Sequence, residues 1–375
     1  YKLNDGQWQT WDLSAVTLHD GDKMYLKSDD EISMAESTST YKKFVMTGSI
    51  AATGNIMSLV NFSDTLTNYA FCYLFKGCTS LTTAPELPAT TLTSYCYSHM
   101  FEVCSSLTQT PVLPATTLAS NCYSNMFSNC SSLTQAPELP ATTLAYGCYG
   151  SMFSYCSSLT QAPALPATTL KDCDRCYSSM FYYCTSLTQA PELPATTLSE
   201  YCYSKMFYYC TSLTQAPELP ALNLLYACYE SMFDSCTSLV TAPILPATTL
   251  NVDCYHFMFS DCSKLNYVKA MFTTIRKDAL DRWLSNVSST GTFIKSKDAT
   301  WNNTDANIPT GWTVQVEGGV PPEPEPERDY LCFTSTGDST VAMTQNGTPN
   351  TSANKVIQYK LNDGQWQTWD LSAVT

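Results

Sequence analysis

A 26-residue repeat dominates this sequence and constrains its fold more than any other feature. From residue 96 onward one phrase recurs, as in CYSNMFSNCSSLTQAPELPATTL and CYGSMFSYCSSLTQAPALPATTL. The spacing is 26, lengthened once to 28 around KDCDRC, and degenerate units flank the regular ones, giving about eight repeats. A fixed period of this length predicts a solenoid, in which each repeat forms one coil and neighbouring coils bury a shared core. The first cysteines of the regular units are Cys96, Cys122, Cys148, Cys176, Cys202, Cys228 and Cys254.

Each repeat carries signals for helical turns, a short strand and two corners. In CYxxMFxxC the apolar residues recur at offsets of three and four, which favours two short helical turns with one buried face. The SSLTQAP that follows predicts a brief strand, and the prolines of APxLP predict corners, because proline cannot lie inside a hydrogen-bonded ladder. We therefore expect an α+β solenoid in which Met126 lies near Met152 and Phe127 near Phe153.

The repeat resembles that of a known family. MFxxCxxLTxAPxLP is similar to AFxxCxxLxxIxLP, the unit of the Treponema-type, or BspA-like, leucine-rich-repeat surface proteins. The likeness covers residues 70–273, and this chain differs in its longer period and in Ala-Pro where the family has an isoleucine strand. The resemblance implies a leucine-rich-repeat solenoid with an extracellular, bacterial (or gut-phage) cell-surface or adhesive role and no enzymatic activity.

The chain also begins and ends with the same seventeen residues, YKLNDGQWQTWDLSAVT, at 1–17 and 359–375. The Asp-Gly pair in this segment predicts a two-residue hairpin. We expect residues 1–62 to form the second half of an Ig-like β-sandwich and residues 329–375 to form the first half of the next one. Offsetting the two copies gives a unit of 358 residues, which indicates a tandem array. The alternative is a non-covalent filament, in which one chain's C-terminal strands complete the next chain's sandwich.

Between these ends we place the solenoid at residues 63–273, a C-terminal cap at 274–316 and a Pro/Glu linker at 317–328. The cap is predicted to contain an amphipathic helix, and similar WLSxVSSTGTF tails close other BspA-like proteins. In the linker, alternating proline and glutamate favours an extended polyproline II spacer. The residues expected on the buried face of the helix are Ala279, Leu280, Trp283, Leu284 and Val287.

Composition argues against several functional classes. The net charge is −14 with only 19 Lys and Arg, so nucleic acids and anionic membranes are poor partners. The chain has no run of eighteen apolar residues, and we predict no membrane insertion. Three histidines, no Gly-rich phosphate loop and no paired carboxylates among apolar neighbours leave little for acid–base or nucleophilic chemistry. We therefore predict no enzyme, no cofactor and no metal.

Seven pairs of cysteines stand eight residues apart, one pair in each regular repeat. We expect two columns of buried thiols that act as small apolar side chains. Disulfides between neighbouring coils are the alternative, because stacked strands come near disulfide reach. The one CxxC, at Cys173 and Cys176, lies where the period is lengthened from 26 to 28.

The two positions before the second cysteine vary among repeats, so we expect them to face solvent. In three successive coils they hold Tyr155, Tyr182, Tyr183, Tyr208 and Tyr209. Exposed tyrosines suit stacking on a glycan or contact with a host protein, since the ring is apolar and the hydroxyl forms hydrogen bonds. Packing between filaments is the alternative.

Two short motifs, DTL at Thr65 and DST at Ser339, resemble acceptor sites for bacterial O-glycosylation. Taken together, the sequence predicts an extracellular structural filament or stalk that assembles with itself. A glycan- or protein-binding adhesin, or a phage fibre, is the second possibility.

Overall fold

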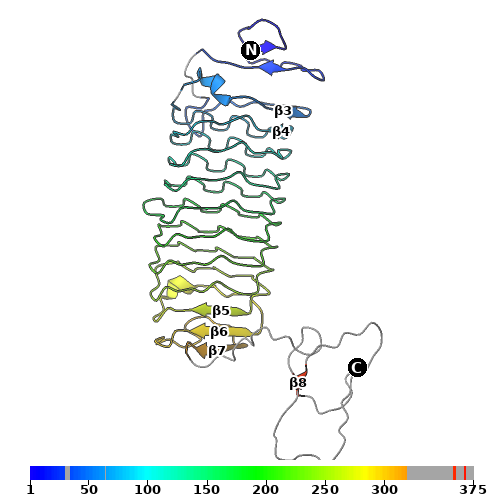
Figure 1. Ribbon diagram of the computed structural model, residues 1–375. Helices are drawn as coiled ribbons and strands as arrows, with labels where there is room; N and C mark the ends of the chain where they lie inside the picture. Colours follow the sequence, from blue (N-terminus) through cyan, green and yellow to red (C-terminus); the bar gives the residue numbers. More distant parts are fainter. Residues whose placement is uncertain (30–33, 64, 319–357, 360–366, 369–375) are drawn as a thin grey trace, which may run out of the picture. The chain divides into compact units, whose positions relative to one another are not determined.

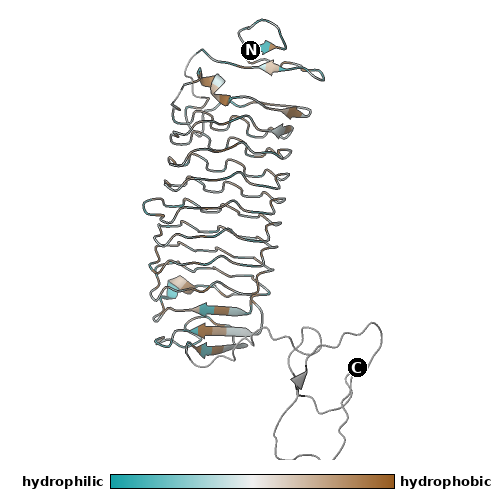
Figure 2. Ribbon diagram, viewed as in Figure 1, coloured by the Kyte–Doolittle hydropathy of each residue, from teal (hydrophilic) through white to brown (hydrophobic). Residues whose placement is uncertain are grey.

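The computed structural model describes residues 1–29, 34–63, 65–318, 358–359 and 367–368 (Figure 1). The chain divides into two compact units, Tyr1–Val320 and Pro321–Thr375. In the first unit, Figure 1 shows coils stacked one on another from the N-terminal end to β7. Figure 2 shows that apolar and polar residues are interspersed along each coil. The apolar side chains of every coil are buried in a common core. The repeat solenoid expected from the 26-residue period is confirmed.

Equivalent side chains of successive coils stack in columns through this core. The phenylalanine column runs from Phe75 to Phe259 with ring centroids 5.4–5.8 Å apart. The expected neighbours Phe127 and Phe153 lie 5.7 Å apart, and both are fully buried. Because each ring packs between two others, the core is continuous along the stack and no coil has a core of its own.

The CYxxMFxxC segment is not helical, and the helical turns predicted for it are wrong. In the coil around Phe153, alternate amides bond within the segment: Met152 N–H donates to Tyr149 O and Cys156 N–H to Phe153 O. The amides between them donate to the next coil, as Phe153 N–H does to Met180 O at 3.0 Å. Every fourth residue, here Ser151 with φ 53° and then the residue four positions on, is left-handed. A chain of tight turns therefore replaces the helix, because a left-handed residue interrupts right-handed helical geometry.

The strands expected at SSLTQAP are reduced to single bridges in most coils. Parallel bridges join Gln135 to Gln161, Gln161 to Gln189 and Gln189 to Gln215. The proline two residues after each glutamine lacks an N–H and stops the ladder from extending. Where the sequence has no proline, longer strands form: β5 (Tyr267–Ala270), β6 (Gly291–Lys295) and β7 (Trp312–Val316) make a parallel sheet in the order β5-β6-β7.

Residues 274–316 continue the stack beyond the last regular repeat. The amphipathic helix predicted here is wrong: only η2 (Lys277–Leu280), a 3₁₀ turn, forms before tight turns resume. The burial predicted for the segment is right, since Ala279, Leu280, Trp283 and Leu284 are buried and Val287 packs against the core. Phe259 N–H donates to Trp283 O, so this segment uses the same inter-coil ladder as the repeats.

The N-terminal residues pack on the opposite end of the same unit. Phe44 N–H donates to Leu74 O, and β3 (Ile50–Ala51) pairs in parallel with β4 (Leu81–Thr83), followed by η1 (Ile56–Val60). Residues 34–60 thus form a coil on the first repeat, although they lack the CYxxMFxxC motif. Within the described ranges no two-sheet sandwich is present, and the predicted half-sandwiches at 1–62 and 329–375 stay predictions.

The two copies of the seventeen-residue segment share one backbone pairing. In the first copy, Gln9 N–H donates to Tyr1 O and the Tyr1 ammonium donates to Gln9 O at 2.7 Å. In the second unit, β8 (Gln358–Tyr359) pairs with β9 (Gln367–Thr368), which sets Tyr359 opposite Gln367, the same two positions. In the first copy this pairing encloses residues 2–8, more than the predicted two-residue Asp-Gly turn. Of the predicted linker at 317–328, residues 319–328 lie outside the described residues. Of residues 329–375, only 358–359 and 367–368 are described.

A second aromatic column supplies a test of the core. The buried tyrosines from Tyr97 to Tyr255 stack at 5.8–6.1 Å, and the hydroxyls of Tyr97, Tyr177 and Tyr229 have no hydrogen-bond partner. A buried polar group without a partner destabilises the folded state by about 1–3 kcal/mol. We expect Tyr177→Phe to raise the free energy of unfolding by about 1 kcal/mol, measured by urea denaturation. The exposed Tyr155→Phe is the control and is expected to be neutral.

Candidate functional site

The candidate site is the surface formed by the five tyrosines before the second cysteines. Tyr155, Tyr183 and Tyr209 each occupy the left-handed position of a turn, with φ of 59–60°. This corner points the side chain away from the core, and Tyr155 and Tyr209 are 44% and 38% exposed. Tyr182 and Tyr208, one residue earlier, are half-buried. The inter-coil amide ladder fixes the spacing, since Tyr155 N–H donates to Tyr182 O and Tyr183 N–H to Tyr208 O.

The structure brings all five rings into one contiguous cluster, which we call the tyrosine patch. Tyr183 stacks on Tyr155 at 5.0 Å and on Tyr209 at 4.3 Å. Tyr182 stacks on Tyr208 at 4.8 Å and meets Tyr155 edge-on at 5.5 Å. Of the five residues predicted to face solvent, Tyr155 and Tyr209 are exposed, whereas Tyr182, Tyr183 and Tyr208 are half-buried. The binding role assigned to them stays a prediction.

The fold itself does not require tyrosine at these positions. The same left-handed column holds Asn129 and Ser235 in flanking coils, and asparagine is among the residues that tolerate this conformation best. A bulky side chain in the left-handed region is an outlier that costs of order 1–3 kcal/mol. Bulky side chains recur at the left-handed positions of this stack, since Val103 occupies the same column and Tyr201 and Phe257 occupy others, so the backbone conformation alone assigns these tyrosines no role.

Charged residues that sequence analysis did not single out border the patch on its C-terminal side. Asp234 follows Tyr208 in the same column of the stack, and Tyr209 N–H donates to Asp234 O. Burial, with a smaller contribution from the Asp261 carboxylate, raises the pKa of Asp234 to about 6, while the Ser235 hydrogen bond and Lys205 oppose the shift. Burial, and next the charge of Asp234, raises the pKa of Tyr208. The signal for Asp234 was available, because it and Glu102 are the acidic members of a column that otherwise holds Ser and Tyr.

The Tyr182 hydroxyl of the patch stays protonated at neutral pH, because its pKa is raised. Burial raises the pKa of Tyr182 to about 12, with Tyr155 and Tyr208 adding to the shift. The tyrosine patch thus offers apolar ring faces, hydroxyls that donate and accept hydrogen bonds, and acidic side chains at one edge. These groups suit a polyhydroxylated ligand that presents both C–H faces and hydroxyls.

The raised pKa of Asp234 predicts a pH dependence of stability. Because the folded-state pKa lies above the unfolded value, the carboxyl favours the folded state when protonated, and this contribution is lost as the pH rises from about 4 through about 6. We expect Asp234→Asn, which keeps the acceptor for the Ser235 hydroxyl, to remove that loss. Melting temperatures of wild type and variant at pH 4.5 and 7 test this; the variant should gain at pH 7 relative to wild type. Equal differences at both pH values would contradict it.

The cysteines form two buried columns of free thiols. All seventeen cysteines in the described part of the chain are buried and unpaired. The second cysteine of each unit donates to a phenylalanine carbonyl of the preceding coil, as Cys156 Sγ does to Phe127 O at 3.1 Å. Burial raises the pKa of Cys156 to about 12, so this thiol is not a nucleophile. Cys173 and Cys176, with Sγ atoms 3.3 Å apart, are buried too. Among the described residues no group of three or more side chains could hold a metal ion.

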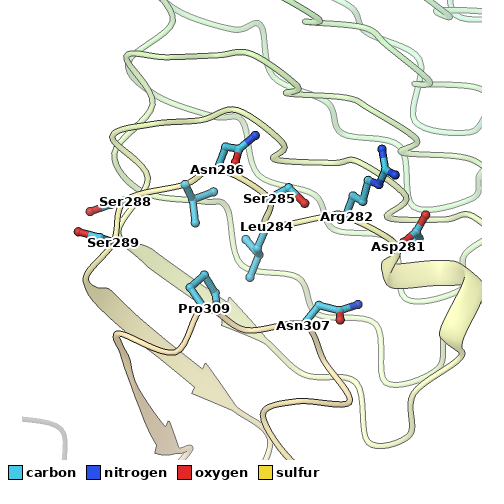
Figure 3. A pocket seen from close by; sticks show the side chains of 10 residues that line it. Asp281, Arg282, Leu284, Ser285, Asn286, Ser288, Ser289, Asn307 and Pro309 are labelled. Atoms are coloured by element: carbon cyan, nitrogen blue, oxygen red, sulfur yellow. The ribbon is translucent and has the colours of Figure 1, made fainter.

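A separate surface pocket of about 370 Å³ lies near the C-terminal end of the first unit (Figure 3). Figure 3 shows Leu284 and Pro309 facing its interior from two coils, with Arg282, Asn286 and Asn307 around it. Asp281 at its edge lies 3.6 Å from His256, and Asn286 is bonded to Asp261 at 2.9 Å. Among the described residues, no hydrogen bond joins the hydroxyls of its serines to a histidine or a carboxylate that could act as a general base. We therefore assign this pocket no catalytic role.

The two predicted glycosylation sites differ in what can be said of them. Thr65 is exposed, and its carbonyl accepts a hydrogen bond from the Ser63 hydroxyl at 3.0 Å. Its side chain is therefore accessible, although modification stays a prediction. Ser339 lies outside the described residues. In the part of the chain that is described, no helix has both the length and the hydropathy that crossing a bilayer requires.

Comparison with known proteins agrees with the geometry. A family model described as BspA type leucine rich repeat region matches six copies, at residues 54–188 and 149–286. Together these matches span more than half of the 375 residues. A search of curated proteins gave no match. The coil period, the stacked MFxxC columns and this match lead to one conclusion: the chain belongs to the BspA-type leucine-rich repeat family.

Proposed function

We propose that this protein is the structural unit of an extracellular, surface-attached fibre or stalk, and not an enzyme. The observation that carries the proposal is the seventeen-residue segment shared by the two ends. Its first copy packs on the N-terminal end of the solenoid unit, where Tyr1 pairs with Gln9. In its second copy the corresponding residues, Tyr359 and Gln367, pair in the same way. A segment that opens one unit and recurs 358 residues later is what a repeated series of units requires.

The build of the first unit supports a mechanical role. One aromatic column continues from Trp11 through Phe44 and the repeat phenylalanines to Trp283, so both ends share a single core. Successive coils are joined by backbone hydrogen bonds, as Phe127 N–H donates to Met152 O and Phe153 N–H to Met180 O. Such a stack suits a spacer that carries a binding surface away from its point of attachment.

The mass of the intact chain from native material, denatured and reduced, tests the fibre proposal. A mass of many 358-residue units is expected for a covalent tandem array. A mass near one unit would reject the covalent array and leave strand exchange between separate chains as the way to a fibre. A single-unit chain that also sediments as a monomer at all concentrations would contradict the fibre altogether.

A second function, adhesion through the tyrosine patch, is favoured by the joining of five rings into one surface cluster. We propose a glycan as the ligand, with ring faces stacking on sugar C–H faces and tyrosine hydroxyls bonding to sugar hydroxyls. A host surface protein is the alternative partner. Aromatic contacts contribute about 0.5–1.5 kcal/mol each beyond their buried area, so loss of two rings should weaken binding about tenfold or more.

A glycan array followed by calorimetry tests this second proposal. Tyr182→Ala combined with Tyr208→Ala is expected to abolish array binding, since it removes the stacked pair at the centre of the patch. Tyr146→Ala is the matched control, because Tyr146 is 46% exposed and has no ring contact with the patch. Absence of binding by wild type at millimolar sugar would reject the glycan, and equal binding by both variants would reject the patch.

A further inference from the structure

The N-terminal segment lies on a specific acceptor surface of the solenoid unit. Its strand β1 (Lys2–Leu3) pairs antiparallel with β2 (Met24–Tyr25), with Lys2 opposite Tyr25. Asn4 closes the pairing: its side chain donates to Asp22 at 2.9 Å and accepts from the Lys23 amide at 2.8 Å. These contacts are directional, so they select one sequence in one register.

Aromatic and cationic contacts complete the same surface. Trp11 stacks on Phe44 with centroids 6.3 Å apart and planes at 14°, which adds one ring to the phenylalanine column. Lys27 lies over the Trp8 ring at 5.2 Å and Lys2 over the Tyr25 ring at 4.7 Å. We define the acceptor surface as residues 22–27 with Phe44.

The segment is nevertheless held at the surface and not inside the core. None of residues 1–17 is buried, and Trp8 remains 45% exposed. The acceptor itself is anchored elsewhere, because Ser28 N–H donates to Ser58 O and Phe44 N–H to Leu74 O. Residues 1–17 can therefore leave without removing any fully buried side chain, since Trp11 at the end of the aromatic column is only half-buried, and the acceptor surface stays attached when they do.

We propose that this acceptor surface binds residues 359–375 of a second copy in place of residues 1–17, so that copies join end to end. The two segments are identical, so each side chain of residues 1–17 that contacts the acceptor surface has a counterpart in residues 359–375. Asn362 corresponds to Asn4 and Trp369 to Trp11. Tyr359 already pairs with Gln367, as Tyr1 does with Gln9, so the backbone pairing that closes the segment is present in the incoming copy. The inference rests on the proposed fibre and names its joint.

Competition with the resident segment sets the conditions for exchange. Residues 1–17 are tethered to the acceptor through a short connection, which gives them an effective concentration on the order of 1 mM. An incoming copy with the same contacts wins only near that concentration, or when the resident is weakened. A substitution within residues 1–17 weakens their own hold on the acceptor surface, and it should therefore increase binding of residues 359–375 from another copy. A substitution that damaged the acceptor surface itself would decrease that binding.

Fluorescence anisotropy with a labelled synthetic peptide of residues 359–375 tests the joint on the full 375-residue chain. We expect Trp11→Ala to bind the peptide at least tenfold more tightly than wild type, and Asn4→Ala to show the same direction of change. A Trp369→Ala peptide should lose at least tenfold on the Trp11→Ala chain. Thermal melting confirms that the variants are folded, and Asn4→Ala serves if Trp11→Ala is not.

Binding that is equal in wild type and both variants, or equal for the two peptides, would overturn the proposal. The mass measurement separates this failure from failure of the fibre. A covalent tandem array with no peptide exchange keeps the fibre and rejects the joint. Exchange in a chain of single-unit mass identifies the joint as the means of assembly.

Discussion

Phe153→Ala is expected to lower the free energy of unfolding by about 3–5 kcal/mol, the range for removing a fully buried aromatic ring. Phe153 has no exposed surface and packs between Phe127 at 5.7 Å and Phe181 at 5.8 Å. In a solenoid, stability comes from each coil and from its interfaces with two neighbours. A cavity in the middle of the stack weakens both interfaces of one coil. The coils before it and the coils after it then stabilise each other less.

Urea denaturation and native-state hydrogen exchange measure this effect. We expect a lower midpoint, a broader transition and faster exchange centred on the coils of residues 127–181. Tyr155→Ala is the matched control two residues away: it removes an exposed ring, and surface changes of this kind are usually within about 0.5 kcal/mol. If both variants lost equal stability, the phenylalanine column would not be the core of the solenoid.

Trp283→Ala is expected to have a similarly large effect, of about 3–5 kcal/mol, confined to the C-terminal coils. Trp283 is fully buried among the rings of Phe259, Phe272 and Phe293 at 6.0–6.5 Å. Its indole N–H donates to Ala306 O at 2.7 Å. Removing it leaves that carbonyl without its partner as well as opening a cavity, and an orphaned buried acceptor adds about 1–3 kcal/mol.

Hydrogen exchange resolves where the stability is lost. Amides of residues 255–316 should exchange faster in Trp283→Ala, whereas those of the coil around Phe153 should keep wild-type protection. The control is Trp8→Ala, which removes an indole that is 45% exposed. Uniform loss of protection along the whole stack would show that the coils unfold as one unit and would contradict the nearest-neighbour account of their stability.

The repeat and its buried columns were predictable from sequence because identical residues at a fixed period must lie over one another in a solenoid. Phe127 over Phe153 and the joining of Tyr155, Tyr183 and Tyr209 follow from spacing alone. The candidate site was predictable as a set of tyrosines for the same reason. Its acidic border was not singled out, since Asp234 departs from the repeat and its burial depends on the coils on either side.

The local conformation of CYxxMFxxC was not predictable from periodicity. A left-handed residue at every fourth position gives apolar spacings of three and four, and an amphipathic helix gives the same spacings. What separates the two is where the amides bond, and half of those in this segment donate to the next coil. That partner lies about 25 residues away, so no local window contains the information.

At the ends of the first unit, too, some features follow from the sequence pattern and others depend on contacts with distant residues. The sequence by itself determined the period, the columns of the core and the identity of residues 1–17 with 359–375, since all of these are properties of repetition. Only the tertiary structure showed that residues 34–60, without the motif, form a coil on the first repeat and that Trp11 extends its aromatic column. The physical reason is that these residues lack the local pattern, and their place is decided by the backbone groups and ring face that the first coil leaves open.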